Sequence, residues 1–321
     1  MHKLTADDIS VIGVIMMYSQ CERVFLEGGP FYHLYTKHIE DDLLFRTEEE
    51  LDQALNIIAV AVFFAGCKVL AFAVMNNHMH FILEGPEQEC RAFYSFIQKK
   101  LGFILSKCGR GLLAQLSAPS LVHINSLKQL RDEIVYVIRN PFVDRVNVNM
   151  HAYKWCSGYL YFNPFLDQMF VKGISASNLP VKKRREFKHE RNPDLDPRIM
   201  VLNGVALPSC FVDYHRAEMF FENARQFFQW LYKNVESQLE VARRIGETIA
   251  LDDIDVWTIS RRLSRELGGS DKPKELPNEV KGQLIKKLKY DYSASNAQIA
   301  RCVGLPVATI NSLFPLSAKT K

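Results

Sequence analysis

The segment VLAFAVMNNHMHFILE, residues 69–84, decides the fold of this chain. It joins two apolar runs, each of strand length, which predict strands at Cys67–Met75 and Phe81–Glu84. His78 and His80 stand two apart where the second strand begins. Because side chains alternate between the two faces of a strand, both imidazoles are predicted on one face.

Two imidazoles on one face of a rigid strand can bind a divalent cation. The pattern equally fits two surface or hydrogen-bonded histidines, because so short a motif often occurs by accident. A cation needs a further ligand, and the predicted helix Leu127–Asn140 offers one. Tyr136 and Asn140 lie four residues apart, so their side chains lie one above the other on this helix.

An asparagine oxygen can bind a hard metal ion, and a tyrosine hydroxyl beside it can act as a nucleophile. The alternative is an ordinary amphipathic helix, with Tyr136 half-buried and Asn140 near its end. Ser126 and Gln129 have the spacing of an N-terminal capping box, and Pro141 is expected to end the helix. The predicted buried face of the helix carries Leu127, Leu130, Ile134 and Val137.

The first half of the chain alternates strand-like and helix-like segments, which predicts one α/β or α+β domain. Gly66 divides the apolar stretch 57–75, which is otherwise long enough to span a bilayer. A helix, a glycine stop and a strand belong to a soluble core, so we expect a cytoplasmic protein without a membrane segment. The other predicted elements are a strand Tyr32–Lys37 and helices Glu48–Gly66 and Gln88–Cys108.

The composition is that of an ordinary globular protein. With 321 residues the chain exceeds a typical single domain, so two domains are expected. Hydrophobic residues make up 48% and charged residues 24%, which excludes extensive disorder. The net charge of +4 permits a nucleic-acid partner without requiring one. Seven dispersed cysteines that form no Cys-x-x-Cys pair disfavour a zinc ribbon and a disulfide framework.

A basic segment, Lys182–Arg191, marks a change in composition after the first domain. We expect it to belong to a linker at 176–200. Such a segment either follows a DNA backbone or is a solvated connector, and its composition fits both. On the first interpretation, the candidate DNA contacts are Lys182, Lys183, Arg184 and Arg185.

The region 201–321 is predicted to be helical. Within 281–314, the spacing of Ala300, Gly304 and Ile310 is typical of a helix-turn-helix. A plain helical hairpin fits the same spacing. On the helix-turn-helix interpretation, the candidate DNA contacts are Lys286, Lys287, Thr309 and Asn311. The other predicted helices are Ala217–Leu239, Leu239–Ile249 and Val256–Leu267.

Two motifs together resemble a known family. The run 69–83, followed downstream by YVIRNP at 136–141, resembles the HUH-type single-strand DNA transposases with one catalytic tyrosine. It is most similar to the REP-associated tyrosine transposases, in which a Met-Pro-Asn-His-x-His strand and a Tyr-Ile-x-x-Asn-Pro helix recur. The family's proline is replaced here by Asn76 or Asn77, depending on the alignment. The resemblance covers about Phe31–Phe162.

The resemblance implies an α+β fold: an HUH-type domain at 1–175, with an antiparallel sheet and packed helices, followed by an all-α region. It implies a metal-dependent single-strand DNA endonuclease and strand transferase that forms a 5′-phosphotyrosine on Tyr136. His78, His80 and Asn140 would hold Mg²⁺ or Mn²⁺, an ion that the resemblance alone implies. The expected partner is single-stranded or hairpin DNA, and the expected state is a monomer.

Two other functions fit the same residues. A domesticated chain with a silent active site would act as a DNA-binding regulator through its helix-turn-helix. A metal-dependent phosphohydrolase would use water in place of Tyr136. An intact set of ligands and nucleophile favours catalysis over regulation, and the substitution Tyr136→Phe separates a transferase from a hydrolase.

Overall fold

The structure is a computed structural model, and it describes residues 19–36, 43–110, 119–143, 153–170, 172–233, 241–242, 244–245, 251 and 253–315. The chain forms two compact units. The first comprises Met1–Phe142 and Val148–Asn234, and the second comprises Val143–Asn147 and Val235–Lys321. The segment expected to be a linker, 176–200, therefore lies within the first unit.

Four strands form the main sheet of the first unit, in the order β2-β3-β1-β4. All three pairings are antiparallel, as expected. β1 and β3 are buried along their whole length, which explains their apolar sequences. β4 was not predicted, because its sequence PSLVHI begins with proline and is mostly half-exposed. The strands are β1 Phe31–Thr36, β2 Lys68–Val74, β3 Met79–Glu84 and β4 Pro119–Ile124.

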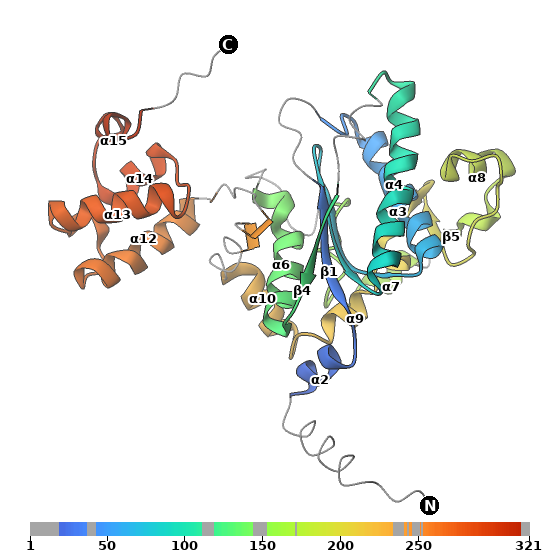
Figure 1. Cartoon of the computed structure of the whole chain (residues 1–321), viewed down its shortest axis with the longest axis horizontal. Coiled ribbons are helices and arrows are strands. Elements are labelled where there is room, and N and C mark those ends of the chain that lie inside the picture. Colours follow the sequence, from blue (N-terminus) through green and yellow to red (C-terminus); the bar gives the residue numbers. More distant parts are fainter. Residues whose placement is uncertain are drawn as a thin grey trace, which may run out of the picture. The chain divides into compact units, whose positions relative to one another are not determined.

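Different helices cover the two faces of this sheet (Figure 1). Phe81 of β3 packs against Phe93 of α4, with ring centroids 5.2 Å apart. His80 points to the opposite face, which it shares with Tyr35, its partner in the β1 register. That second face is covered by α6, while α3 packs beside α4 on the first. The helices of this unit include α2 Gln20–Leu26, α3 Glu48–Ala65, α4 Glu87–Lys107, α6 Leu127–Val143, α7 Leu166–Phe170, α9 Tyr214–Glu218 and α10 Ala224–Lys233.

The ends of α3 follow from local chemistry. The Thr47 hydroxyl accepts a hydrogen bond from the Glu50 amide at 3.3 Å, which caps the first turn. Gly66 ends the helix with a φ of 88°, a conformation that strains any residue with a side chain. Gly66 thus separates the helix from β2, as predicted. Within the described parts of the chain, no helix is long and apolar enough to cross a membrane.

α6 departs from the prediction at both ends. The Ser126 hydroxyl accepts from the Gln129 amide at 3.1 Å as expected, but the Gln129 side chain accepts from the amide of Asn125 rather than Ser126. The helix does not end at Pro141 and continues to Val143. A proline removes one intrahelical donor, a loss that a helix tolerates this close to its end. Asn140 therefore lies within the helix.

The segment 176–200 is not a free connector. It carries α8, and a small antiparallel sheet, ordered β5-β6-β7, flanks it; α8 and β7 pack against α3. The region 201–321 is therefore not all-helical as expected, because it begins with strand residues that belong to the first unit. The Asn56 side chain of α3 donates to the Gly204 carbonyl at 3.1 Å and accepts from the Ala206 amide at 2.7 Å. Phe187 is buried and anchors α8. These elements are β5 Ile174–Ser175, η1 Ala176–Asn178, α8 Val181–Lys188, β6 Met200–Leu202, β7 Val205–Ala206 and η2 Pro208–Cys210.

The expected continuous helix 217–239 is broken. α9 ends at Glu218 and α10 begins at Ala224, with Phe220 and Phe221 buried between them. Residues 234–240, 243 and 246–250 lie outside the described residues. Most of the predicted helix 239–249 therefore lies outside them as well.

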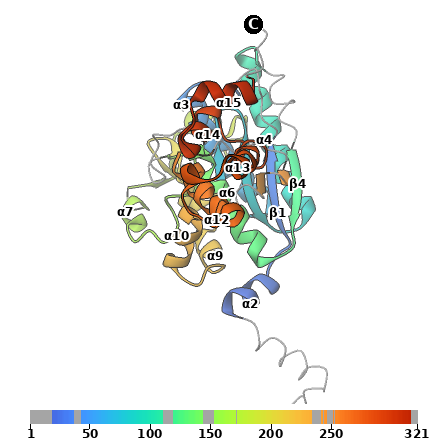
Figure 2. The ribbon, with the colours of Figure 1, turned by 90° about the vertical axis from the view of Figure 1, so that its left-hand side faces the viewer.

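The second unit is a cluster of helices (Figures 1 and 2). α14 and α15 are joined at Gly304, which adopts a left-handed φ of 70°. Ile299 of α14 and Ile310 of α15 are fully buried and hold this pair in the cluster. The predicted helix Val256–Leu267 is present within α12. The elements are α12 Asp253–Gly268, η3 Pro273–Glu275, α13 Asn278–Tyr290, α14 Asn296–Val303 and α15 Val307–Leu313.

Candidate active site

The three predicted metal ligands lie together in the first unit. His78 directly precedes β3, His80 lies on it, and Asn140 projects from α6. His78 Nε2 is 3.0 Å from Asn140 Oδ1, and His80 Nε2 is 3.2 Å from Asn140 Nδ2. The two imidazole rings are perpendicular, with centroids 4.9 Å apart. The fold thus brings Asn140 of α6 next to His78 and His80, although Asn140 follows His80 by 60 positions in the sequence.

A tight turn fixes the position of His78. The Met75 amide donates to the His78 carbonyl at 2.8 Å, which closes the turn between β2 and β3. The Asn76 side chain donates to the Phe45 carbonyl at 2.9 Å, which ties the turn to the segment before α3. The Met79 amide donates to a buried threonine hydroxyl of β1 at 2.9 Å. The backbone around the first imidazole is therefore held from three sides.

Tyr136, the predicted nucleophile, belongs to the same cluster. It lies one turn before Asn140 on α6, and its ring centroid is 5.7 Å from that of His80. The cluster is closed to solvent, since Tyr136 is 2% exposed and His78 is 1% exposed. A phosphate that reacts with Tyr136 would therefore require the packing around the cluster to open.

Sequence reasoning missed two members of the cluster, His33 of β1 and Glu133 of α6. Both are fully buried. His33 Nδ1 lies 2.6 Å from Glu133 Oε2, and His33 Nε2 lies 3.0 Å from His80 Nδ1. Two patterns pointed to them: Glu133 precedes Tyr136 by three residues on the helix, and His33 shares a strand face with Tyr35.

This chain of hydrogen bonds sets the proton positions on two rings. The Glu133 carboxylate can only accept, so His33 donates through Nδ1–H and presents a lone pair at Nε2. When both rings are neutral, His80 donates through Nδ1–H to that lone pair, and its own lone pair lies at Nε2. The Asn140 amide nitrogen donates toward this lone pair. A neutral imidazole with its lone pair at Nε2 is the form that binds a metal ion, which would take the place of the Asn140 N–H as the partner of that lone pair.

His78 has an oxygen acceptor at each ring nitrogen. Nδ1 lies 2.7 Å from Asn77 Oδ1, and Nε2 faces Asn140 Oδ1. A neutral imidazole has a single N–H; when it donates to Asn77, the Nε2 lone pair and the Asn140 oxygen both remain as possible donors to a cation.

The donor set therefore fits a cation with mixed ligands: two imidazole nitrogens and one amide oxygen. Imidazole suits transition metals and the amide oxygen suits Mg²⁺ or Mn²⁺. Among the described residues, no group of three His, Cys, Asp or Glu side chains could hold a metal ion. A cation beside His78 and His80 would therefore take its third protein donor from an amide, that of Asn140.

The predicted DNA contacts are divided between the two units. On α8, Lys182, Lys183 and Arg185 are exposed and Arg184 is half-buried; on α13, Lys286 and Lys287 are exposed. Lys287 Nζ lies 3.7 Å from a carboxylate oxygen of Asp291. On α15, Thr309 is exposed, whereas Asn311 Oδ1 accepts a hydrogen bond of 2.9 Å from the Asn296 side chain.

Comparison with known proteins gives one distant likeness. No family model matches the chain, and no curated protein matches it. A solved structure of a REP-associated tyrosine transposase bound to a REP hairpin is 15% identical, with a TM-score of 0.33. The match covers 43% of this chain and 82% of that one. At these values the likeness is too distant to assign a function.

Proposed function

We propose that the first unit is a metal-dependent single-strand DNA endonuclease and strand transferase with Tyr136 as its nucleophile. The observation that supports this most directly is the convergence of His78, His80 and Asn140 beside the Tyr136 ring. Mg²⁺ or Mn²⁺ is the proposed ion. When bound, it polarises the scissile phosphate and neutralises charge that develops in the transition state.

The Tyr136 hydroxyl oxygen attacks phosphorus. A bond forms between that oxygen and phosphorus, the bond between phosphorus and the 3′ oxygen breaks, and the phenolic proton passes in net terms to the departing 3′ oxygen. The products are a 5′-phosphotyrosine and a free 3′-hydroxyl. Phenolate, with a pKa of about 10, is a good leaving group, so a second 3′-hydroxyl can reverse the step and join strands.

The second unit is the proposed DNA-binding module, with α14 and α15 as its helix-turn-helix. Thr309 is exposed on α15 and is the stronger candidate for contacts to base edges, because Asn311 is engaged by Asn296. Lys286 and Lys287 on α13 are exposed and can contact phosphates. If the first unit proves inactive, this module supports the alternative function, a DNA-binding regulator.

The test is covalent capture of labelled DNA. Single-stranded and hairpin oligonucleotides are incubated with the full chain and Mn²⁺ or Mg²⁺, then separated on a denaturing gel. Tyr136→Phe and His78→Ala are compared with Tyr290→Phe, which removes the hydroxyl of an exposed tyrosine of the second unit. We expect the label to stay on the wild type and on Tyr290→Phe, and to be absent from the other two variants.

Each contrary outcome selects another function. Cleavage that persists in Tyr136→Phe indicates a hydrolase that uses water. Absence of both cleavage and adduct across a broad set of hairpins, together with a shift on a native gel, indicates a DNA-binding regulator.

A further inference from the structure

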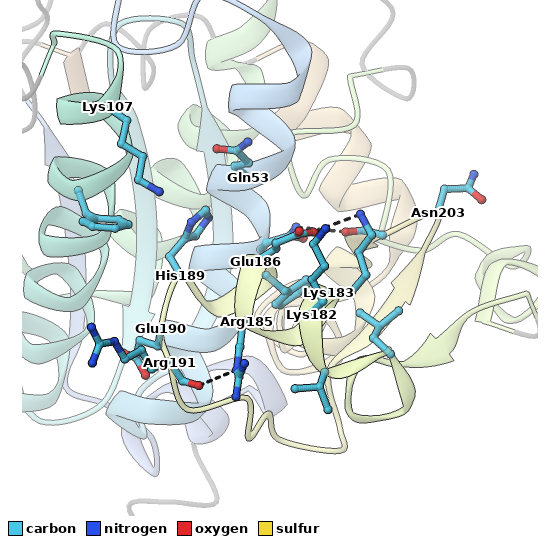
Figure 3. Close-up of a pocket in the computed structure, with 16 residues that line it drawn as sticks. Gln53, Lys107, Lys182, Lys183, Arg185, Glu186, His189, Glu190, Arg191 and Asn203 are labelled. Carbon is cyan, nitrogen blue, oxygen red and sulfur yellow. Dashed lines mark hydrogen bonds and ion pairs between the residues drawn. The ribbon is translucent and has the colours of Figure 1, made fainter.

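The first unit carries a groove of about 1510 Å³ on its surface (Figure 3). Its walls come from α3, α4, α8 and the residues that follow α8. α3 and α4 cover the sheet face opposite His80, and α8 packs against α3. The proposed chemistry at Tyr136 does not use this groove.

The groove carries an excess of positive charge. Five of its lining side chains are cationic and two are carboxylates, which leaves three positive charges when His189 is neutral. Both carboxylates already have partners: Glu186 pairs with Lys183 at 3.2 Å, and Glu190 pairs with Lys100 and Lys188 outside the lining. The cations with no ion pair among the described residues are Lys107, Lys182, Arg185 and Arg191.

The positive charges of the groove also affect His189, which lies among them. Burial, followed by the positive charges of Lys107 and Lys100, lowers the pKa of His189. The Arg185 side chain donates to the Arg191 carbonyl at 2.9 Å, which holds these two cationic residues next to each other (Figure 3). A ligand with several negative charges would therefore meet cations that are already gathered and are not neutralised by protein carboxylates.

An exposed aromatic ring stands among these cations. Phe103 of α4 is 52% exposed and lines the groove. Lys107 lies one turn further along the helix, with its Nζ 4.4 Å from the centre of the Phe103 ring. An aromatic platform beside a row of cations is the arrangement that binds single-stranded nucleic acid, because bases stack on the ring while phosphates meet the cations.

We propose that this groove binds single-stranded nucleic acid outside the active site, with Lys182, Arg185 and Arg191 at phosphates and Phe103 under a base. The inference rests on the proposed function, since it assigns a second contact to the same DNA. A strand cut at Tyr136 must continue around the sheet to reach α8. Long strands therefore bind more tightly than short ones, and flanking DNA contributes to affinity without entering the chemistry.

The test measures binding and salt dependence with the full chain. A labelled mixed-sequence oligonucleotide of about 30 nucleotides is titrated by fluorescence anisotropy at several salt concentrations. The main variant combines Lys182→Gln, Arg185→Gln and Arg191→Gln. Each phosphate contact on a single strand contributes about 0.7 to the slope of log affinity against log salt. Loss of three contacts therefore lowers the slope by about 2, and lowers the affinity at about 0.1 M salt roughly 100-fold.

The matched control removes three exposed positive charges elsewhere in the first unit, with Arg23→Gln, Lys68→Gln and Arg225→Gln. This control changes the net charge by the same amount as the groove triple variant, and it should retain most of the wild-type affinity for the oligonucleotide. Phe103→Ala should weaken binding about tenfold with little change in slope, because stacking is insensitive to salt compared with phosphate contacts.

Failure of this inference is distinguishable from failure of the proposed function. Groove variants should still form the Tyr136 adduct with a short hairpin, whereas Tyr136→Phe should bind the long strand and form no adduct. Unchanged affinity and slope in the groove triple variant would overturn the groove assignment. So would a triple variant that keeps its DNA affinity but loses binding to vesicles of anionic phospholipid, since that result assigns the cations to a membrane surface.

Discussion

Replacement of Glu133 by glutamine tests whether the buried hydrogen-bond chain prepares His80 for a metal ion. Glu133 is two hydrogen bonds away from the lone pair of His80, through His33. The substitution keeps the shape of the side chain and an oxygen acceptor for His33, but it removes the negative charge. Charge-assisted hydrogen bonds are about twice as strong as neutral ones, so the hydrogen bond from His33 Nδ1–H to residue 133 weakens.

The expected loss of Mn²⁺ affinity depends on the number of hydrogen bonds between Glu133 and the metal-binding nitrogen of His80. Loss of an outer partner of a metal-binding histidine typically lowers metal affinity about 10- to 100-fold. Because His33 stands between Glu133 and His80, we expect the lower end, about tenfold, for Mn²⁺. Glu133→Ala should weaken Mn²⁺ binding further and also destabilise the fold by about 1–3 kcal/mol, since it leaves a buried His33 N–H without its acceptor.

The assay is calorimetric titration of Mn²⁺ into the full chain, with thermal unfolding of the metal-free protein in parallel. Asp132→Asn is the matched control. Asp132 is adjacent on α6 and also buried, but its carboxylate pairs with Lys128 at 2.8 Å, away from His33. Equal Mn²⁺ affinity in Glu133→Gln and wild type, or an equal loss in Asp132→Asn, would refute the role assigned to this chain.

Three further predictions concern the fold. Gly66→Ala should cost about 1 kcal/mol in the free energy of unfolding, measured by urea denaturation, because φ is 88° while the space for a Cβ is ordinary; no loss would contradict the strain. Tyr161→Phe should cost about 1–2 kcal/mol in the same assay, because its buried hydroxyl donates to the Leu70 carbonyl at 2.6 Å. Burial raises the pKa of Cys156 to about 12, so at neutral pH a thiol reagent followed by peptide mapping should modify exposed Cys108 first and Cys156 only after unfolding.

Local sequence signals were sufficient where one residue type determines the backbone. Gly66 ends α3 because its φ is positive, and the apolar run after it forms β2. His78, which directly precedes β3, and His80 on it reach the same cluster, as the two-residue spacing at the start of the strand predicted. These features depend on neighbouring residues, so they were accessible without knowledge of the fold.

Features that depend on distant partners were not accessible. The composition of 182–191 is the same for a solvated connector and for a helix anchored by one buried side chain, Phe187. The strands β5 to β7 are two or three residues long and carry no period to detect. Glu133 resembles any surface glutamate on an amphipathic helix until the fold places His33 against it.

The burial of Tyr136 has a consequence for the population of reactive molecules. Under the proposed function, a phosphate can bind only to the fraction of chains in which the cluster has opened, so the measured affinity is the intrinsic affinity multiplied by that fraction. If opening costs about 2.7 kcal/mol, roughly one molecule in a hundred is competent at any moment, and the apparent dissociation constant is about 100-fold weaker than the intrinsic one. Substitutions that merely loosen the packing over the cluster should then increase apparent affinity while they lower stability. Under the proposed function, a resting chain kept closed in this way shields Tyr136 from adventitious phosphates until a DNA strand binds whose binding free energy offsets the cost of opening.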